Sequence, residues 1–300
     1  MEVDPTSSRA FIVIFGIIAL AIMALNLLII IAILKDPLGK LRSTFSYLLI
    51  HLCVCNFLTG VIPLPIYMYF LWLGHQKIQV FSHTKLVTHL FYIASVFSTF
   101  TLSIDRYKAI RDPVHYHHSS SIKRVVFYIL GLWSCVAIDL FGQFFYGTKF
   151  RLIFGTLTFS LMVTAGPIMY FRIRSVFNYY NHQGNDPDSN KVLLLPSPEL
   201  IKRRKKIEKS VLDTCKVLVG LQIISWLPVL IVEYGELFVE SISHKQAVLA
   251  GCVVNILGSI GAIGEPLVCI FRLKNFKKSI KYSFVKKERP NSIKPVNAPK

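Results

Sequence analysis

The sequence predicts an all-α membrane protein in which seven helices form one bundle, followed by a short amphipathic eighth helix. Hydrophobic residues make up 53% of the 300 positions and charged residues only 17%, which is too apolar for an ordinary soluble domain. Seven runs of low charge are each long enough to cross a bilayer core of about 30 Å. Lys and Arg also gather in alternate connections between these runs, as membrane topology requires.

The first apolar run holds no charged residue from Ala10 to Leu34, and at about 1.5 Å per residue a helix of that length crosses the membrane. The other runs are similar, and their helices are expected to extend past the limits by a turn or more. The predicted spans are 10–34, 43–71, 85–110, 122–143, 152–177, 205–235 and 246–271.

The distribution of cationic residues sets the expected orientation. The connections after the first, third, fifth and seventh spans hold 3, 5, 10 and 10 Lys or Arg, which is 28 of the 34 in the chain. Such residues stay on the cytoplasmic side, so we expect a multi-pass plasma-membrane protein with the short N-terminus 1–9 outside. The net charge of +18 therefore indicates topology and attraction to anionic lipids of the bilayer. It does not indicate a nucleic-acid surface.

The segments outside the spans also have distinct compositions. Pro63 and Pro65 should kink the second span, and 141–151 is expected to be an outer loop. The stretch 178–204 is rich in Asn, Asp, Gly, Pro and Ser, which predicts a flexible third inner loop. Apolar residues at 273, 276, 280 and 284 with Lys between them predict a membrane-surface helix over 273–285, followed by a tail at 286–300.

The most distinctive stretch lies where the third span meets a basic loop. It reads Asp105-Arg106-Tyr107, then Ala109-Ile110, then Pro113 and a Tyr three residues further on. Ionisable groups at membrane depth are costly and usually pair or mark function. The extended pattern resembles the third helix and second inner loop of rhodopsin-like (class A) G-protein-coupled receptors. The alternative is a charged helix end without a signalling role.

Other residues extend the resemblance over nearly the whole chain. Ser225-Trp226-Leu227-Pro228 is similar to the family's C-W-x-P in helix six, Trp133 to its fourth-helix Trp, and Glu265-Pro266 stands in place of its N-P-x-x-Y. Glu208 matches the acid that in relatives pairs with the Arg of D-R-Y and holds the inactive state. The resemblance implies that coupling and switching use Asp105, Arg106, Tyr107, Pro113, Glu208, Trp226, Pro228 and Pro266.

The chain also departs from the family. None of its six cysteines falls in an outer loop, so the disulfide that most relatives carry there is not expected. Ser175 and Cys269 replace the Tyr residues of helices five and seven that rearrange around the Arg in relatives. The resemblance therefore implies signalling by a modified switch.

A polar site is expected in mid-bundle. Helix one carries Asn26, like the family, although a lone Asn can simply bond a neighbouring backbone. Most relatives have Asp on helix two and Asn before the helix-seven Pro, whereas here Asn56 and Glu265 are exchanged. If the helices pack as in the family, these two side chains share one pocket, where a sodium ion or a proton could be held. The alternative is a neutral hydrogen-bonding acid without a switch role.

The ligand pocket is expected between the outer halves of the helices. Thr88 takes the place of the Asp of amine receptors, and an outer vestibule with Glu233, Glu236, Glu240 and Asp139 would attract a cationic ligand. These acids could equally form a solvated rim or pair with Lys85 and Lys149. The candidate pocket residues are Thr88, His89, Tyr92, Glu233, Glu236, Asn255 and Ser259.

Several function classes are excluded or placed second. We find no Gly-rich phosphate loop, metal-spaced His/Cys set or nucleophile elbow, so no enzyme is predicted. Ser259 stands where a retinal pigment needs its Lys, so no retinal is expected. The predicted function is a receptor that couples an extracellular ligand to heterotrimeric G proteins. The alternative is a seven-helix membrane protein without such coupling, either a silent partner subunit or a carrier.

Overall fold

The computed structural model of the chain describes residues 5–37, 39, 41, 43–73, 78–111, 116, 121–183, 198–238 and 244–284. All regular structure in these residues is helical, as expected. The helices are α1 (Pro5–Lys35), α2 (Thr44–Val61), α3 (Pro63–Trp72), α4 (Ile78–Arg111), α6 (Ser121–Gln183), α7 (Pro198–Phe238), α8 (His244–Arg272) and α9 (Lys274–Phe284).

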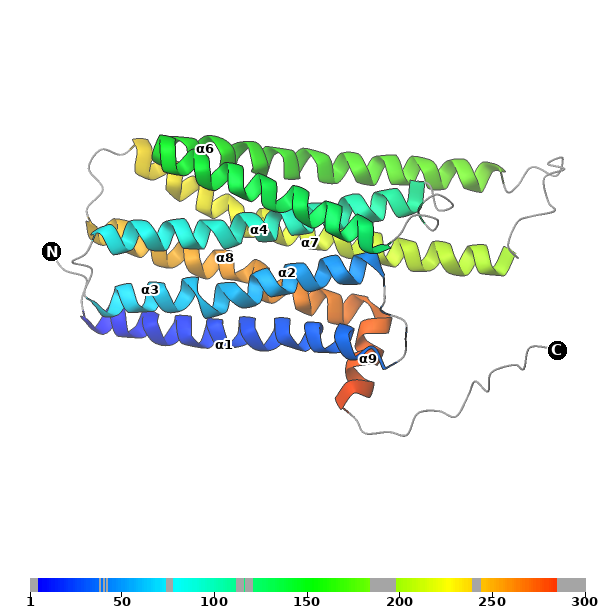
Figure 1. The fold of residues 1–300 in the computed structure, drawn as a ribbon, viewed down its shortest axis with the longest axis horizontal. Coiled ribbons are helices and arrows are strands. Elements are labelled where there is room, and N and C mark those ends of the chain that lie inside the picture. Colours follow the sequence, from blue (N-terminus) through cyan, green and yellow to red (C-terminus); the bar gives the residue numbers. More distant parts are fainter. Residues whose placement is uncertain are drawn as a thin grey trace.

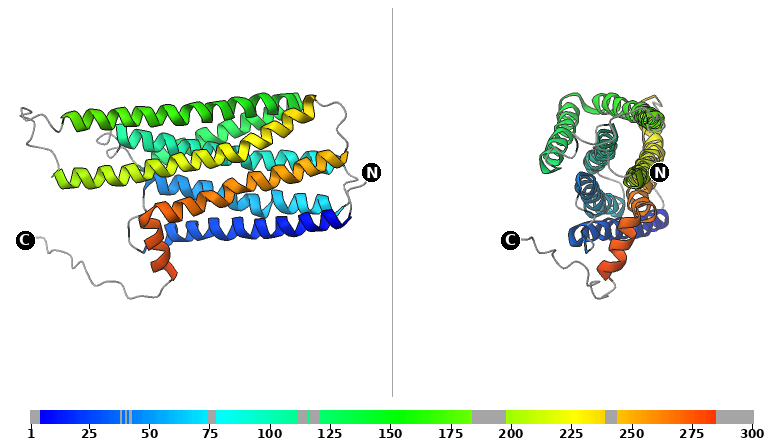
Figure 2. Two further views of the ribbon diagram at one scale, coloured as in Figure 1. Left: turned by 180° about the vertical axis from the view of Figure 1, so that it is seen from behind. Right: turned by 90° about the vertical axis from the view of Figure 1, so that its right-hand side faces the viewer.

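The long helices lie along one axis as a bundle, and α9 leaves it at a steep angle (Figures 1 and 2). The helix α4 is central, because it packs against α2, α3, α6 and α7. We call the end of the bundle where α1 begins the N-terminal end, and the opposite end the α9 end. Six described segments are long and apolar enough to cross a membrane, and the seventh expected span, 152–177, lies within α6.

The helix α6 contains the fourth and fifth expected spans, and the ribbon doubles back between them (Figure 1). Only Gly147 in it is non-helical, with φ +65°, a conformation that glycine adopts readily. The chain therefore does turn within the expected loop 141–151, but the reversal takes only Gly147, and the residues on either side of it are helical.

A second glycine allows the arms of α6 to meet beside this bend. A Cβ on Gly142 would stand 2.0 Å from the ring of Phe150, so the ring packs directly on the glycine backbone. Phe150 is itself held between Tyr146 and Phe154, with ring centroids 6.1 and 5.8 Å away. The close approach therefore leaves no room for a side chain at position 142.

The second span bends as predicted from its prolines. The helix α2 ends at Val61 and α3 begins at Pro63, with Ile62 as the cap residue between them. Proline removes a helical donor and crowds the preceding turn. The break therefore sits where the sequence placed it.

The α9 end is closed by short-range contacts and an apolar core. After α1, the backbone N–H of Leu41 donates to Asp36 Oδ2 at 3.0 Å, and Ser43 caps α2 by accepting from Ser46 N–H. The amphipathic helix expected at 273–285 is present as α9. Its Phe276 is buried, and Ser279 donates to the backbone oxygen of Ala32 at 3.2 Å.

The expected loop 178–204 is shorter than its composition indicated. The helix α6 continues to Gln183 and α7 begins at Pro198, so both ends of that stretch are helical. Proline is favoured in the first turn of a helix, where its missing N–H is not needed. Residues 184–197 and the tail 286–300 lie outside the described residues.

We predict that Gly142→Ala destabilises the protein by about 1–3 kcal/mol, the usual cost of overpacking, because the new Cβ would collide with Phe150. Gly131→Ala is the matched control on the same arm, since nothing lies within 4 Å of its Cβ position. Alanine favours a helix over glycine by about 1 kcal/mol, so the control should be neutral or stabilising. Thermal unfolding of the detergent-solubilised protein measures both. Equal melting temperatures for the two variants would contradict the packing at this bend.

Candidate functional site

The D-R-Y motif forms a closed cluster at the α9 end of α4. Asp105 is fully buried, and its Oδ2 accepts from Arg106 Nε at 3.1 Å and also from Arg106 Nη2. The guanidinium reaches Tyr116 as well, with Nη2 donating to the phenol oxygen at 2.9 Å. Tyr116 in turn donates to the carboxylate at 2.9 and 3.0 Å. The buried charge of Asp105 is therefore met by a cation and a neutral donor together.

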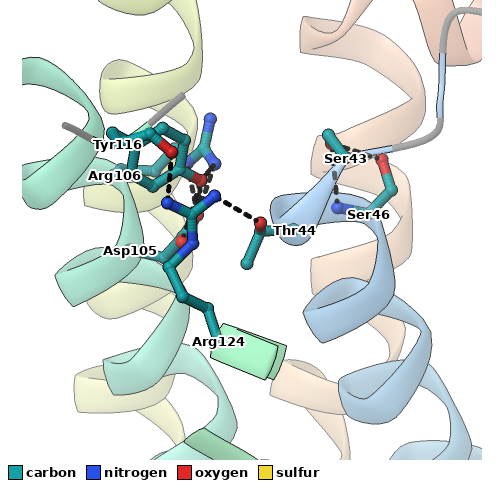
Figure 3. Close-up of polar contacts among 7 residues, drawn as sticks. All are labelled: Ser43, Thr44, Ser46, Asp105, Arg106, Tyr116 and Arg124. Atoms are coloured by element: carbon teal, nitrogen blue, oxygen red, sulfur yellow. Dashed lines mark hydrogen bonds and ion pairs between the residues drawn. The ribbon is translucent and has the colours of Figure 1, made fainter. Parts of the chain in front are cut away.

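Tyr116 is itself held from two sides, as Figure 3 shows. The guanidinium of Arg124 lies 3.7 Å from the centre of its ring, and Arg124 also donates to the Tyr116 backbone oxygen and, at 3.3 Å, to Thr44 on α2. Burial raises the pKa of the Tyr116 phenol, while Arg106 lowers it and Asp105 raises it. The phenol therefore keeps its proton and remains a donor to Asp105.

The middle of the bundle holds a second buried acid. Glu265 on α8 is 1% exposed, and its carboxylate accepts from three helices. Asn56 Nδ2 donates to Oε2 at 2.6 Å. Gln222 Nε2 and Thr99 Oγ1 donate to Oε1 at 2.5 and 3.3 Å. The expected contact between Asn56 and Glu265 is present, and α4 and α7 join it.

The direction of every bond in this network is fixed. Ser95 donates to Asn56 Oδ1 at 3.1 Å and accepts from Gln222 Nε2 at 3.0 Å. Asn56 and Gln222 both turn an amide N–H toward Glu265, so the carboxylate is the common acceptor. An ionised carboxylate can only accept, and hydrogen bonds to a charged group are among the strongest. The network therefore ties α2, α4, α7 and α8 to one acid.

Asn26 lies apart from this acid. Its amide donates to the backbone oxygens of Ile22 at 2.8 Å and Ala262 at 3.0 Å. It therefore links α1 to α8 one turn before Glu265. Of the three residues expected to share a polar site, two bond each other and the third bonds the backbone.

A small cavity lies beside the network. Its volume is about 10 Å³, roughly what one water molecule needs. Trp226 and Tyr92 line it together with Asn56, Ser95 and Gln222, so it connects the mid-bundle network to the level of Trp226.

The expected pocket residues of α4 gather around Trp226. Its ring lies 6.0 Å from that of His89 and 6.4 Å from that of Tyr92, both edge-on. The Tyr92 phenol packs on Gly258, where a Cβ would stand 2.5 Å from its oxygen. Thr88 is buried beside His89.

The other expected pocket groups are partly turned inward. Ser259 donates to the backbone oxygen of Asn255 at 2.7 Å, and Asn255 donates to that of Gly251 at 2.8 Å. Asp139, expected in an open vestibule or paired with a Lys, is instead fully buried, and its Oδ2 lies 3.0 Å from His89 Nε2. That expectation was wrong because the face of α6 that carries Asp139 packs toward α4, where His89 lies.

Some expected site residues fall outside what the structure describes. Pro113 is among them, as are the side chains of Glu208, Glu233 and Glu236. Tyr107 is partly buried. Pro228 and Pro266 both lie inside their helices, α7 and α8.

Comparison with known proteins shows what the chain resembles. The model of the 7 transmembrane receptor (rhodopsin family) matches residues 25–152. The solved structure of squid rhodopsin superposes with a TM-score of 0.74 at 19% identity, over 95% of this chain and 87% of that one. This likeness shows the fold. The expected fold class of the chain, an all-α seven-helix membrane bundle, is confirmed.

Two curated relatives of this chain show how far the sequence similarity extends. The human histamine H4 receptor is 31% identical over 132 residues, which cover 42% of this chain and 33% of that receptor. The chain thus spans about a third of that relative's length. Chimpanzee trace amine-associated receptor 1 is 23% identical over 295 residues, covering 88% of this chain and 84% of that receptor. Both relatives are receptors, so the prediction that the chain is not an enzyme is confirmed.

Three residues of the Glu265 network, and Tyr116 of the Asp105 cluster, were not predicted as site residues. The signal of the three network residues was polarity inside an apolar helix combined with helical spacing. Ser95 and Thr99 are four residues apart on α4, and Gln222 is four before Trp226, so each pair shares a face. Tyr116 was part of the D-R-Y pattern without an assigned role, because a loop residue's position is not fixed by periodicity.

We predict that Tyr116→Phe destabilises the protein by about 1–3 kcal/mol, since it leaves a buried carboxylate short of a donor. Tyr107→Phe is the matched control, because no hydrogen bond of its phenol is found among the described residues. Thermal unfolding in detergent would compare the two variants. A Tyr116→Phe melting temperature equal to that of the control would mean that the phenol does not stabilise Asp105.

Proposed function

We propose that this receptor lies in the plasma membrane with its N-terminal end outside and couples an extracellular ligand to a heterotrimeric G protein. The observation that carries the proposal is the closed Asp105–Arg106–Tyr116 cluster at the α9 end. The orientation is supported by the 28 of 34 cationic residues in the connections expected at that end. The basic amphipathic helix α9 would then lie on the inner leaflet.

In this proposal Arg106 becomes available to contact the G protein when the receptor is activated. Its side chain is 15% exposed and keeps its charge at all physiological pH values. In the resting arrangement its donors are engaged by Asp105 and Tyr116. A ligand that binds the active arrangement more tightly shifts the population toward it, which frees the guanidinium for the partner. An ion pair from Arg106 to Glu208 on α7 would add to the restraint.

We expect Arg106→Ala to abolish basal and ligand-dependent G-protein activation, because the contact for the partner is removed. Nucleotide exchange on each G-protein class, measured in membranes from expressing cells, would test this. An N-terminal epitope detected on unpermeabilised cells controls for expression and reports the orientation.

Glu208→Ala is the counterpart variant, and it should raise basal exchange by loosening α7. Unchanged exchange in Arg106→Ala would favour the alternative, a seven-helix protein without G-protein coupling. Unchanged basal exchange in Glu208→Ala would remove the ion pair from the mechanism and leave the rest standing.

The second restraint in the proposal is the Glu265 network, which takes the part of an atypical switch. Ser175 and Cys269 replace two tyrosines of the family's usual switch. Gln222 instead ties α7 to α8 and α4 through bonds of 2.5 and 3.0 Å. Pro228 lies inside α7 about two turns further on, and proline allows a helix to bend. Release of Gln222 would therefore let the α9-end half of α7 swing about Pro228.

Glu265 also gives the proposed site for a sodium ion or a proton. Both carboxylate oxygens accept from protein donors, so either cation has to compete with the amides of Asn56 and Gln222. A bound proton would remove the charge that holds these donors. The network would then weaken, and the helices that it joins would separate more easily.

We predict that Glu265→Gln raises basal exchange and removes its dependence on sodium and pH, because an amide cannot exchange a proton or attract a cation. Gln222→Leu should also raise basal exchange, but it should increase the response to sodium, since an oxygen of Glu265 is freed. Exchange is measured with sodium replaced by an organic cation and at several pH values.

The double change of Asn56→Asp with Glu265→Asn restores the net acid count and serves as the control. It should recover part of the wild-type response. If wild type and Glu265→Gln respond identically to sodium and pH, the pocket is not an ion site.

The ligand in this proposal carries a positive charge. The curated relatives are named as histamine and trace-amine receptors. Glu233 and Glu236 lie in the last turns of α7, toward the N-terminal end of the bundle, and Asp139 lies on α6. Acids in a low-dielectric vestibule concentrate cations. Thr88, His89, Tyr92, Asn255 and Ser259 would supply the remaining polar contacts.

A further inference from the structure

Buried polar atoms without hydrogen-bond partners gather around Trp226. Native proteins contain few such atoms, and each one calls for a donor, an acceptor or a ligand. They lie on four helices, and contacts with Trp226, His89 or Gly258 connect most of them. The atoms are Thr88 Oγ1, His89 Nε2, Tyr92 OH, Asp139 Oδ1, Ser225 Oγ and Asn255 Oδ1.

Asp139 is the most costly member of this group. Its side chain is fully buried, and its Oδ2 lies 3.0 Å from His89 Nε2 and accepts from Gln143 Nε2 at 2.6 Å. The imidazole contact is close but falls short of an aligned hydrogen bond, because Nε2 has no such partner. The other oxygen, Oδ1, has none either. The hydrogen bond from Gln143 and the imidazole contact therefore fall on the same oxygen.

No Lys or Arg contacts this carboxylate within the part of the chain that the structure describes. A buried charge without a full set of partners is strongly destabilising. Ionisable groups within a membrane bundle are retained mainly where function needs them. Asp139 therefore has unused capacity for a cation with several donors.

His89 connects Asp139 to the expected pocket. Its ring contacts the carboxylate on α6 and stands edge-on to Trp226 on α7 at 6.0 Å. The preceding residue, Thr88, is the position of the amine-binding Asp in similar receptors, and its hydroxyl is buried without a partner. Position 88 thus has no acid, but the next residue, His89, contacts the carboxylate of Asp139 on α6.

We propose that Asp139, positioned by His89, is the counter-ion for the protonated amine of the ligand. This rests on the proposed function and names the recognising acid. With a neutral imidazole the pair carries one negative charge. An ammonium group brings three donors and no acceptor, which suits an unpartnered carboxylate oxygen. The hydroxyls of Thr88 and Tyr92 are available for its remaining N–H groups.

The test measures dissociation constants of histamine, dopamine and 2-phenylethylamine from ligand-induced thermal stabilisation of the detergent-solubilised full chain. At least one amine should bind, and 2-phenylethanol, which lacks the charge, should not. Asp139→Asn should weaken amine binding roughly 10- to 100-fold, as expected for loss of a charged hydrogen bond. Adding Thr88→Asp to Asp139→Asn should restore binding, because the acid returns to the same site from α4.

Asp213→Asn is the control, because Asp213 is partly exposed and pairs with Lys216 at 2.9 Å toward the α9 end. Glu233→Gln compares Asp139 with the acid of the outer vestibule. The proposal is overturned if no amine binds the wild type, if 2-phenylethanol binds equally, or if Asp139→Asn binds like the wild type.

If Asp139→Asn does not fold, His89→Gln decides, because it keeps the acid and removes its positioning ring. Weaker amine binding supports the proposal and unchanged binding overturns it. G-protein exchange is a separate readout, so a receptor that couples but ignores amines contradicts this inference alone.

Discussion

The structure depends on one constraint, which is that a carboxylate inside an apolar bundle must find donors within the protein. Glu265 meets it with neutral donors, because two amides and a hydroxyl from α2, α4 and α7 converge on its two oxygens. Removing one partner from a buried charge costs far more than a typical hydrogen bond contributes. The four helices are thereby held in one register, and the small residues of α8 let them approach.

The same constraint is met differently at three depths. At the α9 end Asp105 has a full cation and a phenol, which makes a closed cluster. In mid-bundle Glu265 has only neutral donors, so its charge is stabilised by dipoles that can rotate away. Nearer the N-terminal end Asp139 has one oxygen without any partner. The hydrogen bonding of the buried acids is thus most complete at the end proposed to meet the G protein. It is least complete at the end proposed to meet the ligand, where Asp139 keeps one oxygen without a partner.

The sequence predicted the fold well because hydropathy, charge asymmetry and proline positions are local properties. They determine where the chain spans the membrane, how it is oriented and where its helices bend. It predicted the break before Pro63, the surface helix α9 and the contact of Asn56 with Glu265. It overestimated the length of the connection at 141–151, where the reversal takes only Gly147. It also missed Gln222, Thr99 and the pairing of Asp139 with His89. These contacts depend on how each helix is rotated about its own axis. A single polar residue in an apolar run does not determine that rotation.

Trp226 lies between the surroundings of two buried acids, Asp139 toward the N-terminal end of the bundle and Glu265 in its middle. Its ring contacts His89, which holds Asp139, and it lines the same cavity as Gln222, which holds Glu265. A chain of contacts transmits a signal only if some element in it has two arrangements that both sites bias. We propose α7 as that element, since Pro228 lies inside it between Gln222 and the end of the helix at Phe238. A cation that moves His89 would press on Trp226, and the strain would fall on α7, whose backbone hydrogen-bond ladder Pro228 interrupts.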